Sequence, residues 1–357
     1  MNYMNVNLEE MLDIYENIIY KNSRNKNKLY NFEKNKMSIL YDLCYKLNNN
    51  IYDIGKYNIF LIKYPKYRII MSLSVTDKIV NHYVTIKYLI PVLSKYLDNR
   101  NIATRKNMGT DYGIKLIKKY IEINKKYDKF YILKLDIKKY FYNIDHVVLK
   151  NMLVDYFDEN VYDLLCKIID STDEEYINKR INVIKSNVNS NKVNDLPCCE
   201  QYKSLPIGNM TSQFFAIYYL SGLDHFIIHN LHLKYYIRYM DDFVIIHHDK
   251  DYLKKCKDII EEKLKNKYKL ELNAKSTIYD INNGFDFLGY TYKVKNNKTI
   301  ISISRKTFKN IKKHIKTYNK DINSFNMFVN YYNSFKYCNN GSVKLYLDEY
   351  FYNKIGI

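Results

Sequence analysis

The sequence predicts an α+β fold, and three observations support this class. Aromatic and β-branched residues form short runs typical of strands at residues 130–137, 235–240 and 243–248. Segments with apolar residues at helical spacing lie before, between and after these runs. The two kinds of segment are interleaved without the regular alternation of a parallel β/α fold. A length of 357 residues further suggests two or three subdomains.

The N-terminal elements can be placed from their apolar spacing. Apolar positions from Leu8 to Ile19 indicate an amphipathic helix, and a basic linker is expected after it. Residues 51–70 are typical of short strands around Tyr64-Pro65. A second helix is expected from near Asp77, with Thr76 or Asp77 as its N-cap.

The later elements alternate between strand, helix and loop patterns. In chain order we expect a loop at 107–110, a helix at 112–123, the strands named above, a polar loop or poorly packed insertion at 171–204, a helix at 252–267, a strand or hairpin at 284–294 and a basic helical tail at 305–357.

The composition limits the function. With 57 Lys and Arg against 38 Asp and Glu, the net charge of +19 favours polyanionic partners such as nucleic acids, although codon bias in an AT-rich genome would also raise the lysine content. No run approaches the roughly 18 apolar residues of a membrane helix. Six cysteines without C-x-x-C spacing, behind an N-terminus that lacks a secretory signal, fit a reducing cytoplasm.

An acidic pair stands out between two apolar runs, in Tyr239-Met240-Asp241-Asp242. The flanking runs predict a hairpin with the two carboxylates at or next to its tip. Adjacent carboxylates raise each other's pKa or require a cation between them, so the pair indicates a metal site. A solvated acidic turn is the alternative.

A third carboxylate, Asp136, closes the apolar strand at 130–135. Mg²⁺ prefers oxygen ligands, and two such ions about 4 Å apart are the arrangement used for in-line phosphoryl transfer. Because side chains alternate along a strand, Asp241 and Asp242 cannot both face the metals on a regular strand. We therefore expect Asp136 and Asp241 to be the principal ligands and Asp242 the weaker one.

These residues lie in motifs that resemble those of reverse transcriptases. The segments LKLDIKKYFYNIDH, LPIGNMTSQ, YMDD and GFDFLGY follow one another in the order of motifs A, B, C and E of that family. Upstream, KYRII and NIATRKNMGT resemble its fingers motifs. The similarity spans roughly residues 60–300. It implies an RNA-directed DNA polymerase.

The resemblance implies a right-hand architecture. The expected parts are an N-terminal helical extension at 1–49, fingers at 50–128 and 147–207, a palm at 129–146 and 208–292, and a short helical thumb at 293–357. The palm would be an antiparallel sheet backed by helices that carries the catalytic site. Tyr318, Tyr331 and Tyr332 of the thumb would stack on nucleic acid or pack the helices.

The resemblance also assigns the metal site. Asp136, Asp241 and Asp242 match the catalytic metal-binding aspartates of the family, and the Ile137 carbonyl matches an additional ligand. Two Mg²⁺ ions are implied, with Mn²⁺ as a substitute. Phe141 matches the steric gate that excludes a ribose 2′-hydroxyl, and a core phenylalanine is the alternative.

Further residues are assigned by the resemblance to the dNTP and the primer. Gly208 would allow close backbone approach, or would simply be a turn glycine. Lys66 and Arg68 match residues that grip the triphosphate, and Lys275 matches a lysine that protonates the leaving pyrophosphate; each is alternatively a surface charge. The dNTP-binding residues are thus Lys66, Arg68, Phe141, Gly208, Gln213 and Lys275, and the primer grip is Phe287, Leu288, Gly289 and Tyr290.

The motif B segment departs from the common Gln-Gly-x-x-x-Ser-Pro pattern. Here Ile207 precedes the glycine and Gln213 replaces the proline, which resembles reverse transcriptases of diversity-generating retroelements. Phage-defence reverse transcriptases and other retroelements have related segments. The implied partners are template RNA, a cDNA or primer and dNTPs, with a small basic accessory protein or a structured non-coding RNA.

Two other functions stay open at this point. Untemplated or protein-primed synthesis is one, because forty tyrosines offer many priming hydroxyls. A basic RNA-binding protein with a decayed polymerase fold is another, although the intact aspartates argue against it. RNase H or maturase segments are not expected in the roughly sixty residues after GFDFLGY.

Overall fold

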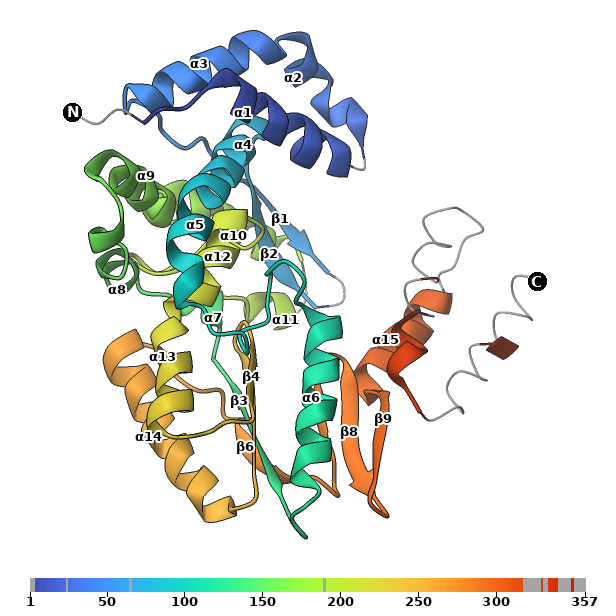
Figure 1. The fold of residues 1–357 in the computed structure, drawn as a ribbon. Helices are drawn as coiled ribbons and strands as arrows, with labels where there is room; N and C mark the ends of the chain where they lie inside the picture. The colour runs from blue at the N-terminus through green and yellow to red at the C-terminus, as the bar shows by residue number, and fades with distance from the viewer. Residues whose placement is uncertain are drawn as a thin grey trace. The chain divides into compact units, whose positions relative to one another are not determined.

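The computed structural model describes residues 4–23, 25–63, 66–188 and 191–316, together with 329, 333–339 and 348–349 (Figure 1). The chain divides into two compact units. The first unit is made of residues 1–99, 137–225 and 262–271, and the second of residues 100–136, 226–261 and 272–357. Each unit is therefore assembled from three separate stretches of chain.

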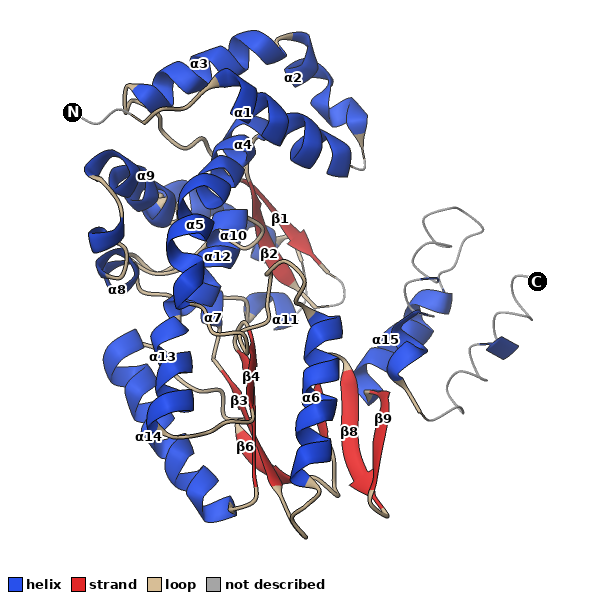
Figure 2. Ribbon diagram, in the orientation of Figure 1, coloured by secondary structure: helices blue, strands red, loops and turns tan. Residues whose placement is uncertain are grey.

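The first unit combines helices with one small hairpin (Figure 2). Its helices are α1 Leu8–Asp13, α2 Tyr30–Lys34, α3 Lys36–Asn48, α4 Val75–Val84, α5 Ile90–Leu93, α7 Tyr140–Asn143, α8 His146–Asn151, α9 Glu159–Asp170, α10 Glu175–Ser186, α11 Asn191–Asn194, α12 Met210–Tyr219 and α13 Ser221–His225. Turns of π-helix cover Ile14–Tyr20 and Thr85–Leu89, and 3-10 turns cover Lys26–Leu29, Ser94–Tyr96 and Val154–Tyr156.

The predicted strands of the first unit are confirmed as an antiparallel hairpin. Strand β1 (Asn58–Ile62) pairs with β2 (Arg68–Ser72), with Ile62 opposite Arg68. Tyr64 and Pro65, around which the strands were expected, lie outside the described residues. The hairpin buries Ile59 and Ile69 on one face, as alternation along a half-buried strand requires.

The N-terminal segment is more helical than the sequence suggested. The predicted first helix is present as α1 and the π-helical turn after it, but the prediction of a basic linker is wrong. On α3, Leu40, Leu43 and Leu47 are buried at helical spacing. The lysines around these leucines raised the average polarity and obscured this narrow apolar stripe.

The prediction of a loop or poorly packed insertion at 171–204 is also wrong. Helix α10 occupies Glu175–Ser186, and α11 follows at Asn191–Asn194. Ile177 and Ile181, four residues apart, are fully buried in a cluster with Ile59 and Ile69 of the β1–β2 hairpin. Because only one narrow face of α10 is apolar, its exposed polar residues dominated the sequence pattern.

The N-cap of α4 differs from the prediction of Thr76 or Asp77. Ser74 is the cap, because its Oγ accepts a hydrogen bond from the backbone N–H of Asp77 at 3.1 Å. The same hydroxyl donates to the Asp77 carboxylate at 2.7 Å. Asp77 is therefore buried in the first turn of the helix, where a carboxylate is favourable.

The second unit contains two antiparallel sheets. The first sheet has the order β4-β5-β3-β6, with β3 Tyr131–Asp136, β4 Tyr236–Tyr239, β5 Asp242–His247 and β6 Thr277–Asp280. The other has the order β7-β8-β9, with β7 Phe285–Phe287, β8 Tyr290–Lys295 and β9 Lys298–Ile303. These sheets, together with the helices, confirm the α+β class, and the predicted strands at 130–137, 235–240 and 243–248 are present.

Helix α6 (Thr110–Asn124) forms the core of the second unit with both sheets. It contacts β5 and β9, and its residues Ile114, Ile117 and Ile121 are buried in one cluster with Val244 and Ile301. The other helical segments of this unit are α15 Arg305–Lys316, a π-helical turn at Phe226–Asn230 and a 3-10 turn at Ser334–Tyr337. Helix α14 (Lys250–Tyr268) begins in this unit and ends in the first.

The C-terminal part is described only in places. Helix α15 agrees with the predicted basic helix, whereas Tyr318, Tyr331 and Tyr332 lie outside the described residues. Strand β9 was not predicted.

Within the described part of the chain, no helix has the length and apolar character that crossing a membrane requires. The division into fingers, palm and thumb stays a prediction.

Gly113 of α6 allows the helix to approach the β7–β8 turn closely. A Cβ atom at this position would lie 2.3 Å from Ile102 Cδ1 and 2.6 Å from Leu288 Cδ1. Alanine gains about 1 kcal/mol of helix propensity but overpacks the core at a cost of about 1–3 kcal/mol. We expect Gly113→Ala to lower the free energy of unfolding by up to about 2 kcal/mol in urea denaturation.

Lys119→Ala is the matched control, because Lys119 is exposed on the same helix. It should change the free energy of unfolding by less than about 0.5 kcal/mol. Gly113→Ala with greater stability than the wild type would contradict the close approach.

Candidate active site

The three predicted aspartates lie at one end of the β4-β5-β3-β6 sheet. Asp136 ends β3 and stands directly opposite Asp242, the first residue of β5. Residues opposed in this way in an antiparallel pair direct their side chains to the same face, with Cβ atoms about 4.5–5.5 Å apart. Asp241 precedes Asp242 in the two-residue turn between β4 and β5.

A buried arginine supports the turn that carries Asp241. Met240, the first turn residue, has φ of 57°, as hairpin turns of the primed types require. Arg238 is fully buried, and its Nη1 donates to the Met240 carbonyl at 3.0 Å. The Arg238 backbone is also bonded to Arg100 and Ile102 on the other side. These contacts offset the strain of a positive φ at a residue other than glycine.

Asp242 lies in an environment that disfavours its ionised form. Burial, with a smaller contribution from the charges of Asp136 and Asp241, raises the pKa of its carboxyl to about 7 against the opposing charge of Lys134. Its Oδ1 is buried and has no hydrogen-bond partner among the described residues. A cation at this position would therefore be strongly favoured.

Lys134 provides the positive charge next to this group and was not among the predicted site residues. Its Nζ lies 3.4 Å from Asp242 Oδ2 and donates to the carbonyl oxygen of Asp286, next to the β7–β8 turn. Lys134 is two residues before Asp136 on β3, so strand alternation places both side chains on one face. The alternation of side chains along β3 is the sequence signal that could have identified Lys134.

A short loop holds the end of β3. The backbone N–H of Asn273 donates to the Asp136 carbonyl at 2.7 Å, and the Asp136 N–H donates to Ser276 Oγ at 3.1 Å. Lys275 is exposed within this loop, and its N–H donates to Asn273 Oδ1 at 3.2 Å. The loop that carries Lys275 is thus anchored on the backbone of Asp136.

The predicted primer-grip residues form the β7–β8 hairpin. Phe287 and Tyr290 are paired and buried, and Leu288 and Gly289 make the turn with φ of 50° and 86°. Positive φ at both turn residues is typical of type I′ turns. The N–H of Ser304 donates to the Gly289 carbonyl at 3.0 Å, which fixes the turn against the start of α15.

Phe141 and Ile137 belong to the first unit. Ile137 is buried directly after β3, and Phe141 is half-buried on α7. The neighbouring Tyr140 hydroxyl donates to the Ala216 carbonyl of α12 at 2.6 Å. The Phe141 carbonyl accepts from the N–H of Leu205 at 2.7 Å. Helix α7 is therefore fixed to the segment that contains motif B.

Gly208 lies against strand β2. Its φ is 123°, and a Cβ atom would lie 3.4 Å from Ile70 Cγ2. The adjacent Ile207 carbonyl accepts from the N–H of Met71 at 3.3 Å. Gln213 is half-buried on α12.

The remaining predicted dNTP residues of the first unit are exposed. Arg68 is the first residue of β2, and Lys66 precedes it. The structure therefore groups Lys66, Arg68 and Gly208 around one hairpin, and it groups the aspartates with Lys275 and residues 287–290 in the second unit.

Comparison with protein families gives a match over most of the described chain. The family model described as reverse transcriptase (RNA-dependent DNA polymerase) matches residues 55–292. The chain belongs to the reverse transcriptase family. The matched residues include the three aspartates, motif B and the β7–β8 turn. The family-level prediction is confirmed, whereas the subtype and the role of each site residue stay predictions.

Solved structures similar to this reverse transcriptase include yeast telomerases. Telomerase from Candida albicans, in complex with a fragment of telomeric RNA, is 14% identical with a TM-score of 0.49, over 76% of this chain and 50% of that one. Apo telomerase from Candida tropicalis, truncated from its C-terminal domain, is 17% identical with a TM-score of 0.47, over 70% and 55%. This chain thus spans about half the length of these structures. No curated protein matches it.

The raised pKa of Asp242 predicts a pH-dependent stability in the absence of divalent cations. The folded carboxyl holds its proton up to about pH 7, whereas the unfolded one releases it near 3.8, so the free energy of unfolding falls as pH rises through this window. Asp242→Asn removes this pH-dependent fall in the free energy of unfolding. With 30% of the side chain exposed, we expect the variant to be more stable than the wild type at pH 8 by on the order of 1–2 kcal/mol.

The measurement is urea denaturation between pH 4 and pH 8 with a chelator present. The difference between Asp242→Asn and the wild type should shrink toward pH 4, where the carboxyl is neutral and resembles the amide. A difference that is the same at all pH values would show that the pKa of Asp242 is not raised in the folded state.

Proposed function

We propose that this reverse transcriptase synthesises cDNA from dNTPs on an RNA template, with Asp136, Asp241 and Asp242 binding two Mg²⁺ ions, for which Mn²⁺ can substitute. The observation that carries the proposal is the pairing of Asp136 with Asp242, beside Asp241, within the segment that matches the family. Bound cations would offset the repulsion among three carboxylates at one end of a sheet.

The donor set fits a hard divalent cation. It consists of carboxylate oxygens, one of which, Asp242 Oδ1, is buried and without a hydrogen-bond partner among the described residues. Mg²⁺ binds through one or two carboxylates and completes its shell with water and substrate phosphates, so three aspartates suffice for such ions.

When bound, such ions favour the ionised primer hydroxyl and neutralise charge on the triphosphate. The chain's own residues position the reactants. Lys134 holds the Asp242 carboxylate at 3.4 Å, and Arg238 holds the turn that presents Asp241. Lys66 and Arg68 bind the triphosphate as charged donors, and Lys275 supplies a proton to the leaving pyrophosphate.

For the biological role we propose diversity generation in a retroelement. The departure of motif B at Ile207 and Gln213 supports this role, because it resembles that subtype. Antiphage defence with a non-coding RNA template, through templated, untemplated or protein-primed synthesis, is the alternative. Repeats in neighbouring DNA that differ at adenines would favour the first role, and a structured RNA gene among defence genes would favour the second.

Asp136→Asn and Asp241→Asn test the catalytic site. Each should reduce dNTP incorporation on a primed RNA of defined sequence to background, a loss of at least about 1000-fold. Affinity for the RNA should hardly change, because only one carboxylate is altered. Primer extension measures the first quantity, and filter binding measures the second.

Asp280→Asn is the matched control for these variants. Asp280 lies on β6 opposite Tyr131, at the other end of β3 from Asp136, and the variant should keep wild-type activity. Retained incorporation in Asp241→Asn would refute the site. Sequencing the wild-type product then separates templated copying from untemplated extension.

Phe141→Ala tests the steric gate. Loss of the ring makes room for a 2′-hydroxyl, so discrimination against ribonucleotides should fall by about 10–100-fold in kcat/KM, while dNTP use is largely retained. Phe141→Tyr, which keeps the ring, should discriminate like the wild type. Unchanged sugar selection in Phe141→Ala would assign Phe141 to packing alone.

A further inference from the structure

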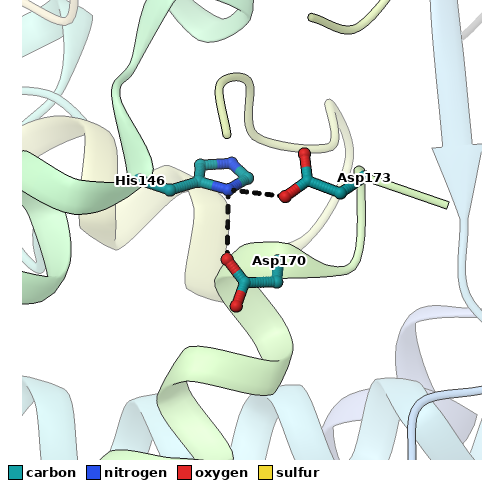
Figure 3. A group of neighbouring side chains, drawn as sticks. All are labelled: His146, Asp170 and Asp173. Carbon is teal, nitrogen blue, oxygen red and sulfur yellow. Dashed lines mark ion pairs between the residues drawn. The ribbon is translucent and has the colours of Figure 1, made fainter. Parts of the chain in front are cut away.

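A second group of ionisable side chains lies in the first unit, apart from the residues assigned above. It consists of His146 at the start of α8, Asp170 at the end of α9 and Asp173 in the loop that follows (Figure 3). His146 Nδ1 lies 3.2 Å from Asp170 Oδ1 and 3.4 Å from Asp173 Oδ2. Among the described residues, these three have ligand atoms that all lie within 4.8 Å of one another.

The hydrogen bonds of His146 determine what its Nδ1 can do. Nε2 lies 2.7 Å from the backbone carbonyl oxygen of Ser204, which only accepts, so Nε2 carries a hydrogen. In the neutral ring, Nδ1 therefore has a lone pair that faces two carboxylate oxygens. Nδ1 and Asp170 Oδ1 are both buried and have no hydrogen-bond partner among the described residues. Three acceptors in contact require a proton or a metal ion between them.

The outer atoms of all three side chains are already occupied. His146 Nε2 is bonded to the Ser204 carbonyl oxygen. Asp173 Oδ1 accepts from the N–H of Tyr202 at 2.9 Å, and Asp170 Oδ2 pairs with Lys150 Nζ at 2.5 Å. Histidines that bind metals almost always donate their other ring N–H to a carbonyl or carboxylate, and the carboxylate ligands are likewise hydrogen-bonded. These outer contacts leave three inner atoms that face one another: His146 Nδ1, Asp170 Oδ1 and Asp173 Oδ2.

The two distances measured from Nδ1 are close to those between ligands of a tetrahedral ion. Ligands placed 2.0–2.2 Å from Zn²⁺ lie about 3.3–3.6 Å from one another, close to the 3.2 Å and 3.4 Å measured from Nδ1. The site also has a route of entry. Asp170 lines a cavity of about 620 Å³, and 40% of its side chain is exposed, so the group is reached from the side of Asp170.

We propose that His146, Asp170 and Asp173 bind a Zn²⁺ ion that ties α8, the end of α9 and the loop at 171–174 together. The imidazole nitrogen among the three donors favours zinc over Mg²⁺, which prefers six oxygens. The metal removes the repulsion among the three acceptors. This proposal does not depend on the polymerase activity.

Zinc binding to the full-length chain tests the proposal. The protein is stripped with a chelator and titrated with Zn²⁺ in excess Mg²⁺, which occupies sites made of oxygens alone. We expect one Zn²⁺ per chain by elemental analysis, a higher Tm with zinc, and an imidazole signature in zinc X-ray absorption. Asp173→Asn should weaken binding by more than about 100-fold, because changes outside the ligand shell already cost about 10–100-fold.

Matched variants make the result decisive. The side-chain amide introduced by Asp173→Asn can donate to Nδ1, so this variant should fold like the zinc-free wild type. His225→Gln should bind zinc normally, because His225 also contacts a backbone carbonyl, that of Tyr96 at 2.9 Å, but lies outside the group. Asp242→Asn should also bind zinc normally.

Two results would overturn the proposal. The first is a wild-type chain that takes up no zinc in the titration, which would mean that His146 and the two carboxylates interact without a metal ion. The second is zinc that is lost in Asp242→Asn and kept in Asp173→Asn, which would place the ion among the catalytic aspartates.

Discussion

The opposition of Asp136 and Asp242 across β3 and β5 is the constraint on which the second unit depends. The register places two carboxylates on one face, and burial raises the pKa of Asp242 to about 7. Such a pair is unfavourable without positive charge nearby. The strands nevertheless hold it, because Leu133, Leu135 and Ile245 of the same two strands are fully buried and fix the register.

Several neighbouring contacts make this arrangement tolerable. Lys134 brings an ammonium group to Asp242, Arg238 supports the turn at Met240, and the loop at 272–276 bonds to both backbone groups of Asp136. Each contact acts on the backbone or on one carboxylate and leaves Asp242 Oδ1 without a hydrogen bond from the described residues. The backbone around the aspartates is therefore held in place, while Asp242 Oδ1 stays available to a metal ion. Preorganised metal binding requires this combination.

The sequence predicted the strands and acidic positions of this site better than their surroundings. Apolar runs beside Asp136 and the acidic pair are strong local signals, whereas the choice of Asp242 as the residue opposite Asp136 depends on the hairpin register, which sequence alone left undetermined. Helix α10 was missed because Ile177 and Ile181 form a stripe too narrow to stand out among polar residues. The group at His146 was missed because its members, 24 and three residues apart, meet only through tertiary packing.

The two clusters of acidic residues meet the same electrostatic problem with different chemistry. Around Asp242 the donors are oxygens, and a lysine ammonium at 3.4 Å supplies a positive charge. Around His146 a ring nitrogen joins two carboxylates, and Lys150 binds the outer oxygen of Asp170, so the inner atoms face one another. Oxygen donors favour a weakly held, exchangeable Mg²⁺ that enters with phosphates, whereas a mixed nitrogen and oxygen set favours a tightly held zinc. If both proposals hold, one chain would keep a bound zinc ion at His146 while the aspartates exchange Mg²⁺ with each nucleotide.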